Sequence, residues 1–247
     1  MVRWSEKSVE KSTIILLTRT ELVKISDGDE NGNSVTERSI RMVMFTLASN
    51  LEMLWVDAVW IFAIHLSAYW GSVVWTGYVY ENQFRSFDKC VRKVLYNQLV
   101  WTPLTIGPLL LLACPTFVDM PVWMGVVQLP LCVCVTDIIF YHLHRMMHWP
   151  SLYPYHKEHH AWRTPIGASA LYADAFEHIV VNVLPPLLAG VLLRCHPWVM
   201  CLWVGVASAN TVVAHAKPGQ HADHHEKFKG NYGVGLMLCD RLYGTYI

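Results

Sequence analysis

The chain has 247 residues, of which 53% are hydrophobic and only 15% are charged. Soluble domains usually carry about 25% charged residues, so this composition favours a protein that lies in a lipid bilayer. The 19 basic and 19 acidic side chains balance, which excludes the bulk positive charge that nucleic-acid binding requires. Seven cysteines form no CxxC pair, so we expect reduced packing residues and not a disulfide framework.

The N-terminal part of the chain differs from the rest. Residues 1–41 are polar and mixed in sign, and the stretch from Ser26 to Ser39 is rich in Asp, Asn and Gly. That composition is typical of a solvated loop. We therefore expect a polar, partly disordered N-terminal segment over residues 1–41 and one membrane domain over residues 42–247.

The first apolar run, Leu54 to Val74, has about the twenty residues that a bilayer crossing needs. It also contains Asp57 and His65, which are unusual in a lipid-facing span. A full crossing would place the basic N-terminus on the opposite side from the later basic flanks. The sequence thus leaves open whether this run crosses the bilayer or re-enters it.

Two further apolar runs, Leu99–Ala113 and Val122–Tyr141, are separated by a loop without Lys or Arg. Basic residues flank their outer ends, at positions 85–93 on one side and at Arg145 and Lys157 on the other. Because basic flanks prefer the cytosol, both outer ends are expected there.

The last apolar block has two halves, residues 179–193 and 198–214, broken near Pro197. Each half is short for a span, so a tilted hairpin that returns to its starting side fits best. The predicted fold is all-α: an integral membrane helical bundle of about four spans with a cytosolic histidine-rich helical cap.

Nine of the thirteen histidines fall into dense groups near the ends of these runs. They are His144 and His148; His156, His159 and His160; His215; and His221, His224 and His225. Because positions i, i+3 and i+4 share one helix face, His144 and His148 should point the same way, and so should the three imidazoles of residues 156–160. The hairpins bring all the groups to one membrane face. Converging neutral imidazoles predict a transition-metal site.

Nine imidazoles exceed the four ligands that a zinc ion takes and suit two metal ions. Imidazole alone does not select among iron, zinc and copper. The zinc-protease box HExxH is absent, and so is the GxSxG nucleophile elbow. With these hydrolytic motifs absent, two redox metals beside a membrane favour a reaction in which activated O2 oxidises an unactivated C–H bond. Side chains lack the oxidising power for that reaction, so a metal must supply it.

Several blocks over residues 85–247 resemble a known family in their order and spacing. They are Phe140-Tyr-His-Leu-His-Arg-Met-Met-His148, His156-Lys-Glu-His-His-Ala-Trp162, Pro165-Ile-Gly-Ala-Ser-Ala-Leu-Tyr-Ala173, Glu177-His178, His221-Ala-Asp-His-His225, Asn231-Tyr-Gly233 and Asp240-Arg-Leu-Tyr-Gly-Thr245. The chain resembles the fatty acid hydroxylase/sterol desaturase superfamily of membrane di-iron oxygenases. Within it, the C-4 methylsterol monooxygenase-like branch, with its fatty acid hydroxylase domain-containing proteins, is most similar.

The resemblance implies a multi-pass enzyme of the endoplasmic reticulum membrane with its metal site facing the cytosol. It implies two iron ions, O2 and NAD(P)H-derived electrons, which a cytochrome b-type carrier and its reductase deliver. The reaction would hydroxylate or oxidise a C–H bond of a sterol, as in C-4 methyl oxidation, or of a fatty acyl chain. All nine clustered histidines carry over as metal ligands, with His215 the least secure, and no catalytic residue is expected beyond the ligands.

Three other residues are candidates for an outer shell around the ligands. Asp137 lies two turns before His144 and either holds an imidazole or makes a buried polar contact between spans. Glu177 is a candidate partner of a ligand, and His178 is a ligand, an outer-shell group or a helix-end residue.

Two departures from the family pattern keep other functions in view. Asp174-Ala175 replaces the usual His-Pro, and the stretch between His215 and His221 is short. The alternatives are a zinc-binding membrane protein or transporter, and a catalytically impaired family member.

Overall fold

The computed structural model describes residues 35–84, 86–113 and 121–247. The chain divides into two compact units, Met1–Leu51 and Glu52–Ile247. The described residues of the first unit are helical, and the second unit carries every histidine group. Helix α1 begins at Val35, so the loop predicted from Ser26 to Ser39 extends five residues too far. No Gly or Pro follows Gly32 before the apolar run begins, so nothing there stops a helix. Residues 1–34 of the predicted N-terminal segment lie outside the described residues.

Within the described ranges the elements are helices, and no strand occurs. The longer ones are α1 (Val35–Val79), α2 (Phe87–Tyr96), α3 (Thr102–Ala113), α4 (Val122–Met147), α7 (Leu184–Leu192), α8 (Pro197–Ala216) and α9 (Gln220–Lys227). The shorter ones are α5 (Tyr153–His156), α6 (Ala175–Glu177), α10 (Leu238–Leu242), the π-helical segments η3 (Asn97–Trp101) and η7 (His178–Val183), and the 3₁₀ turns η5 (His159–Ala161) and η6 (Gly167–Ser169).

Four helical stretches of the described chain are long and apolar enough to cross a membrane: Trp55–Val79, Trp123–Met147, Ala175–Leu192 and Pro197–Ala216. The predicted all-α membrane bundle of about four spans is therefore confirmed. The predicted span over Leu99–Ala113 is not among the four. Its residues divide between the end of η3 and the twelve-residue α3, and a twelve-residue helix rises only about 18 Å.

Helices α3, α4, α7 and α8 enclose the larger of the buried apolar clusters, which includes Ile106, Leu187, Met200 and Trp203. Gly190 lets α7 approach α8 closely, because a Cβ atom there would overlap the end of the Met200 side chain. Large apolar side chains of α1 and α4, such as Trp60 and Trp123, are exposed on the outside of the bundle. An apolar outer surface of this kind matches a lipid environment.

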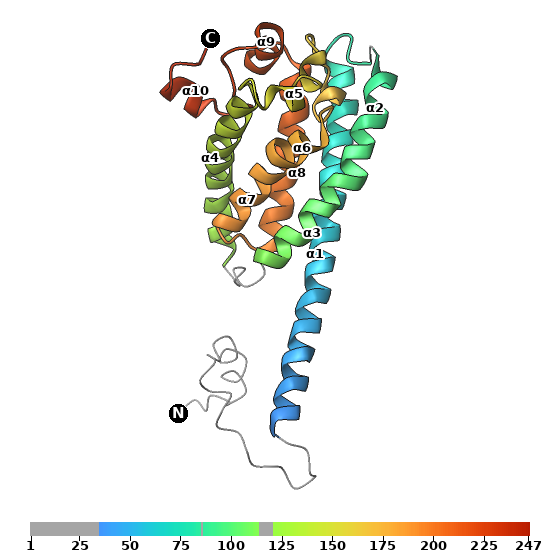
Figure 1. Cartoon of the computed structure of the whole chain (residues 1–247), viewed down its shortest axis with the longest axis vertical. Coiled ribbons are helices and arrows are strands. Elements are labelled where there is room, and N and C mark those ends of the chain that lie inside the picture. The colour runs from blue at the N-terminus through green and yellow to red at the C-terminus, as the bar shows by residue number, and fades with distance from the viewer. Residues whose placement is uncertain (1–34, 85, 114–120) are drawn as a thin grey trace. The chain divides into compact units, whose positions relative to one another are not determined.

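The described helices bring three distant parts of the chain to one end of the bundle. Figure 1 shows α5, α9 and α10 at the end where α4 finishes and α8 finishes, away from the α7–α8 connection. A second buried cluster, which includes Tyr69, Val94, Leu171 and Val212, ties α1, α2 and α8 to the loop after η5. The bundle thus presents the histidine-bearing segments together on one end.

Candidate metal centre

The nine clustered histidines come from five short pieces of structure at this end of the bundle. The last turn of α4 and its C-cap supply His144 and His148, α5 supplies His156, η5 supplies His159 and His160, the last turn of α8 supplies His215, and α9 supplies His221, His224 and His225. Eight of these side chains are buried, and His148 is half-buried. The helical hairpins therefore bring all nine histidines to one end of the bundle, as the sequence predicted.

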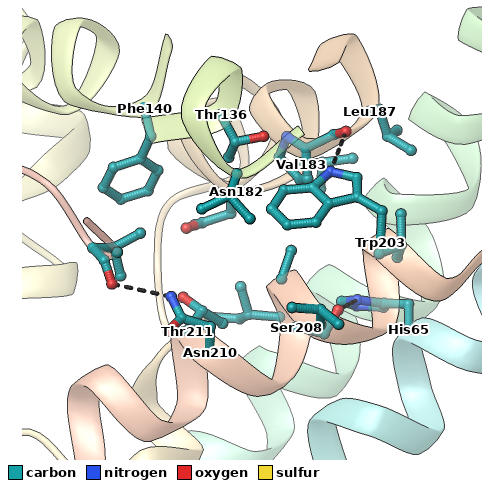
Figure 2. A pocket seen from close by; sticks show the side chains of 18 of the residues that line it. His65, Thr136, Phe140, Asn182, Val183, Leu187, Trp203, Ser208, Asn210 and Thr211 are labelled. Atoms are coloured by element: carbon teal, nitrogen blue, oxygen red, sulfur yellow. Dashed lines mark hydrogen bonds between the residues drawn. The ribbon is translucent and has the colours of Figure 1, made fainter. Parts of the chain in front are cut away.

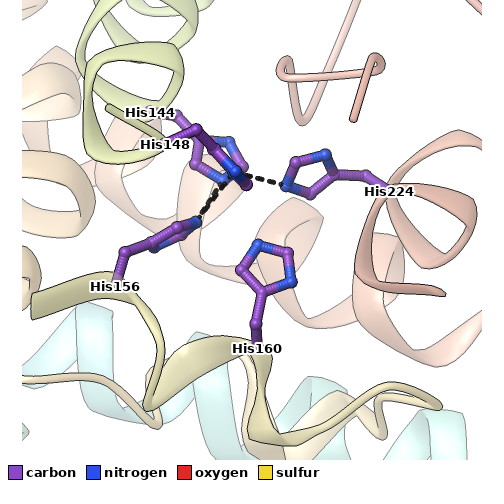
Figure 3. A group of neighbouring side chains, drawn as sticks. All are labelled: His144, His148, His156, His160 and His224. Carbon is purple, nitrogen blue, oxygen red and sulfur yellow. Dashed lines mark hydrogen bonds between the residues drawn. The ribbon is translucent and has the colours of Figure 1, made fainter. Parts of the chain in front are cut away.

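The nine imidazoles form two separate groups, in each of which one ring nitrogen per residue lies within 4.8 Å of all the others. The first group is His144, His148, His156, His160 and His224 (Figure 3). The second group is His159, His215, His221 and His225. The groups adjoin, since the ring centroids of His160 and His225 are 4.8 Å apart. This division matches the prediction that nine imidazoles suit two metal ions.

His144 and His148 join the same group, as their shared helix face predicted. The corresponding expectation for residues 156–160 was wrong, because His159 belongs to the second group. Helix α5 ends at His156, and a turn precedes η5, so these residues do not share one helix face. On α9 the i, i+4 pair His221 and His225 does share a face, and both belong to the second group.

Six of the nine rings donate Nδ1–H to a backbone carbonyl oxygen. The pairs are His144 to Tyr232 (2.7 Å), His215 to Thr211 (2.7 Å), His224 to Gly230 (2.7 Å), His225 to Trp162 (3.0 Å), His159 to Tyr172 (3.2 Å) and His221 to Gly233 (3.2 Å). A seventh ring, that of His156, donates Nδ1–H to a Glu177 carboxylate oxygen at 2.7 Å. Because a carbonyl can only accept, the proton in the first six rings is fixed on Nδ1. Their Nε2 atoms therefore carry bare lone pairs.

These lone pairs face one another inside each group. The Nε2 atoms of His144 and His156 are 3.2 Å apart, and those of His215 and His221 are also 3.2 Å apart. In the His215–His221 pair, and in the His144–His156 pair when Glu177 is ionised, both protons are on the outer nitrogens, so no proton is left to bridge the pair and the facing lone pairs repel. A cation between them removes the repulsion. The donor set therefore fits a metal ion in each group.

Burial and crowding keep the imidazoles uncharged, which is the form that binds a metal. Desolvation lowers the pKa of His156 to about 3, and desolvation, with His156 nearby, lowers the pKa of His148 to about 3. The pKa values of His221 and His224 also fall well below the usual range, again mainly because of burial and then because of the neighbouring rings. At neutral pH these rings are ligands and not acids.

The predicted outer-shell residues differ in what they touch. Glu177 is buried and contacts the ligand candidate His156, as proposed from the sequence. Asp137 contacts no imidazole: its carboxylate accepts the backbone N–H groups of Met237 (3.1 Å) and Leu238 (2.9 Å), just where α10 begins. Seven residues of α4 separate Asp137 from His144, a rise of about 10 Å, which is too far for a carboxylate to reach that ring.

His178 belongs to neither group. Its Nε2 atom forms a hydrogen bond with the Thr102 hydroxyl at 2.9 Å, and the residue is the C-cap of α6 and the first residue of η7, as the helix-end interpretation predicted. Adjacent residues of a helix point about 100° apart, so His178 and Glu177 face different neighbours, Thr102 and His156. A role as metal ligand is therefore not supported by the geometry.

Sequence reasoning assigned no role to Asp240, which organises part of the centre. Its carboxylate accepts the N–H groups of Tyr232 (2.8 Å) and Gly233 (2.7 Å) and the hydroxyl of Thr245 (2.8 Å). The carbonyls of Tyr232 and Gly233 are those that hold His144 and His221. The signal was present in the Asp240 to Thr245 block, whose spacing matched the family without an evident ligand.

The two departures from the family pattern have local explanations. The Asp174 carboxylate accepts the Phe176 N–H at 2.8 Å and so caps the N-terminus of α6. After His215 the chain needs only four residues to reach α9, because α8 ends next to it. His215 still lies within the second group.

Comparison with known proteins gives the same family. Residues 129–245 match the family model described as "Fatty acid hydroxylase", and this segment contains both histidine groups. Residues 129–245 form a fatty acid hydroxylase domain. This match confirms the family that the sequence blocks indicated, and the relatives named below confirm the branch. No solved structure matches the chain.

The names of the curated relatives of this domain refer to fatty acids or sterols. The chain is 35% identical over 127 residues to "Fatty acid hydroxylase domain-containing protein 2" of Homo sapiens, covering 48% of this chain and 38% of that protein. It is 30% identical over 132 residues to "Methylsterol monooxygenase 1" of Rattus norvegicus (46% and 44%) and 31% identical over 136 residues to "Delta(7)-sterol 5(6)-desaturase" of Leptosphaeria maculans (50% and 38%). The matches therefore span less than half the length of each relative.

Proposed function

We propose that this chain is a membrane-bound di-iron oxygenase that uses O2 and reductant to hydroxylate or oxidise a lipid C–H bond. The observation that carries the proposal is the pair of adjoining histidine groups with their lone pairs facing inward. The names of the relatives support a sterol, as in C-4 methyl oxidation, or a fatty acyl chain as the substrate.

In this proposal the first group holds one iron ion and the second group holds the other. Bound iron supplies the oxidising power toward a C–H bond that no side chain has. The described chain supplies the ligands, fixes their tautomers through the Nδ1 anchors and keeps water away by burial. His144, His148, His156, His159, His160, His215, His221, His224 and His225 are the proposed ligands.

A cavity beside the histidine groups supports a lipid substrate. It has a volume of about 270 Å³ and a mostly apolar lining from α1, α3, α4, η7 and α8 (Figure 2). Phe140, which lines it, packs edge-on against His144 with ring centroids 5.2 Å apart. Thr211, which also lines it, anchors His215 through its carbonyl. A lipid in this cavity meets residues that touch both groups.

The proposal places the protein in the endoplasmic reticulum membrane with the metal centre facing the cytosol. Lys89 and Arg92 of α2 are exposed, as is Arg145 beside the first group. Such a basic surface suits an acidic cytochrome b-type carrier, which with its reductase would bring NAD(P)H-derived electrons.

The deciding test combines metal analysis with lipid turnover. Purified protein is expected to contain two iron ions and to oxidise a sterol or acyl lipid in the presence of O2 and reductant. His224→Ala should abolish turnover and lower the iron content, because it removes a ligand of the first group. His142→Ala is the control, since His142 lies on α4 two residues before the proposed ligand His144 but is exposed and outside both groups.

Three outcomes would contradict the proposal. Full turnover by His224→Ala would show that the histidine groups take no part in the reaction. Zinc without O2 consumption would favour a zinc-binding membrane protein or transporter. Two bound iron ions without a product on a panel of sterols and fatty acyl lipids would favour a catalytically impaired family member.

A further inference from the structure

Several polar side chains line the otherwise apolar cavity. Most of them have partners among the described residues. The Gln98 amide donates to His65 Nε2 (3.2 Å), and His65 Nδ1–H donates to the Ser208 hydroxyl oxygen (2.8 Å; Figure 2). His178 Nε2 pairs with the Thr102 hydroxyl (2.9 Å). All of these residues except Gln98 line the cavity.

Two residues that line the same cavity each carry a buried polar atom without a hydrogen-bond partner: Nδ1 of His178 and Nδ2 of Asn182. The His178 side chain is fully buried, with 0% of its surface exposed. A buried polar atom without a hydrogen bond costs stability, so such atoms need an explanation. Neither atom serves the metal groups or the fold. A ligand that satisfies both of them explains their placement.

The hydrogen-bond chain around His178 defines what that ligand must offer. The Thr102 hydroxyl donates to the Asn97 carbonyl (3.4 Å), so His178 Nε2–H donates to the Thr102 oxygen. The proton of the neutral His178 ring is then on Nε2, and Nδ1 is an acceptor. Asn182 Nδ2 is a donor. One acceptor and one donor match a hydroxyl group, which both donates and accepts, whereas a carboxylate or a ketone has no proton for Nδ1.

We infer that the cavity binds a lipid alcohol, whose hydroxyl group donates to His178 Nδ1 and accepts from Asn182 Nδ2. The apolar remainder of the lining covers the hydrocarbon part. As a statement about the substrate, this inference rests on the proposed function. His178 directly follows Glu177, whose carboxylate holds His156, so the hydroxyl site adjoins the metal residues along the backbone.

Equilibrium binding to the purified full-length chain tests the inference without turnover. The probes are radiolabelled cholesterol against 5-cholestene, which lacks the hydroxyl, and 1-hexadecanol against hexadecane. The measured quantity is the ratio of alcohol affinity to hydrocarbon affinity in one detergent. Asn182→Leu should lower this ratio about tenfold relative to the wild type, because a cavity built to bind a hydroxyl rejects the analogue without one.

The matched control is Asn210→Leu. Asn210 lines the same cavity, but its amide already donates to the Val234 carbonyl at 3.0 Å, so the ratio should stay at the wild-type value. Asn182→Leu removes an amide nitrogen without a partner, so it should fold normally. His178→Phe, which removes the acceptor, should lower the ratio in the same way.

The two probe pairs distinguish the source of the hydroxyl. If Asn182→Leu lowers the affinity ratio only for cholesterol against 5-cholestene, the ligand is a sterol alcohol. If it lowers the ratio only for 1-hexadecanol against hexadecane, the ligand is a long-chain alcohol. An equal ratio in the wild type and Asn182→Leu for both pairs overturns the inference.

His224→Ala separates this inference from the proposed function. It should keep the hydroxyl-dependent ratio, because His224 does not line the cavity. Turnover without a hydroxyl-dependent ratio contradicts the lipid-alcohol inference alone. A hydroxyl-dependent ratio without turnover in the wild type contradicts the oxygenase alone.

Discussion

The outer nitrogen of each imidazole determines what the inner nitrogen can do. Where Nδ1–H is donated to a backbone carbonyl, as in His144 and His224, the main chain fixes both the tautomer and the ring orientation. His156 alone uses a side-chain carboxylate, that of Glu177. Glu177 is therefore the outer anchor that can be changed without disturbing the backbone.

Glu177→Ala should weaken iron binding by about 10- to 100-fold, because the His156 ring loses its orienting acceptor. Glu177→Gln should retain part of the affinity, since its amide oxygen still accepts from Nδ1–H. Iron titration of the purified protein measures both changes. Glu158→Ala is the control, because Glu158 lies next to the ligands but pairs with Lys93 at 3.0 Å. Equal affinities for Glu177→Ala and Glu158→Ala would contradict the anchoring role.

At the scale of elements, the segments that complete the centre are short and follow the long helices. The chain after α9 turns through Gly230, whose φ angle is +65°, and the Gly230 carbonyl anchors His224. A Cβ atom there would lie 2.7 Å from the Thr245 carbonyl oxygen. Both the left-handed backbone and the close backbone contact therefore require glycine.

Gly230→Ala should lower the free energy of unfolding by about 1–3 kcal/mol and also weaken iron binding. Gly244→Ala is a sharp control: its φ is +67°, but no atom lies within 4 Å of the added Cβ. It should cost only the backbone strain, about 1 kcal/mol, and leave iron affinity unchanged. Thermal unfolding in detergent and iron titration measure the two effects. A Gly230→Ala variant that matches Gly244→Ala in both would show that the Thr245 contact is unimportant.

The elements also show where sequence patterns stop being informative. Apolar runs predicted the long helices, and the i, i+4 spacing placed His144 with His148. The separation of His159 from His156 and His160 needed the end of α5 and the turn before η5. No periodic pattern encodes such a turn in five residues. The role of Asp137 stayed open for a related reason, because its partners come from a segment one hundred residues later.

For the whole molecule, nine imidazoles at one end of a membrane bundle make stability depend on pH. Unfolded histidines bind protons near pH 6.5, whereas burial lowers the pKa of His148 and His156 to about 3 in the folded chain. Between these values the unfolded state binds more protons. Stability is therefore complete above pH 6.5 and falls as the pH drops toward 3.

Chelated protein should thus lose stability below pH 6.5, by about 1.4 kcal/mol per pH unit for each fully buried neutral imidazole. Iron-loaded protein should have a higher melting temperature at neutral pH and should lose that advantage in acid, where protons compete with the metal for the rings. Thermal unfolding from pH 4 to 8, with and without chelator, measures both. A melting temperature that is independent of pH in the chelated protein would contradict the buried, neutral assignment.

The membrane bundle and the gathering of the histidines at one end followed from composition, run lengths and basic flanks. The cavity did not, because its polar lining combines Thr102, Asn182 and Ser208 from three separate helices. Each of these residues by itself is an ordinary polar residue in an apolar run. Only the cavity that they line together distinguishes them.

Helix α9 contributes to both histidine groups, with His224 in the first and His221 and His225 in the second. The carbonyls of Gly230, Tyr232 and Gly233, which follow α9, then orient three of the rings. Neither group is complete until α9 and the residues up to Gly233 have been synthesised. A metal ion that needs the full donor set of either group can therefore bind only after α9 has been made, and a chain that stops before α9 lacks donors of both groups.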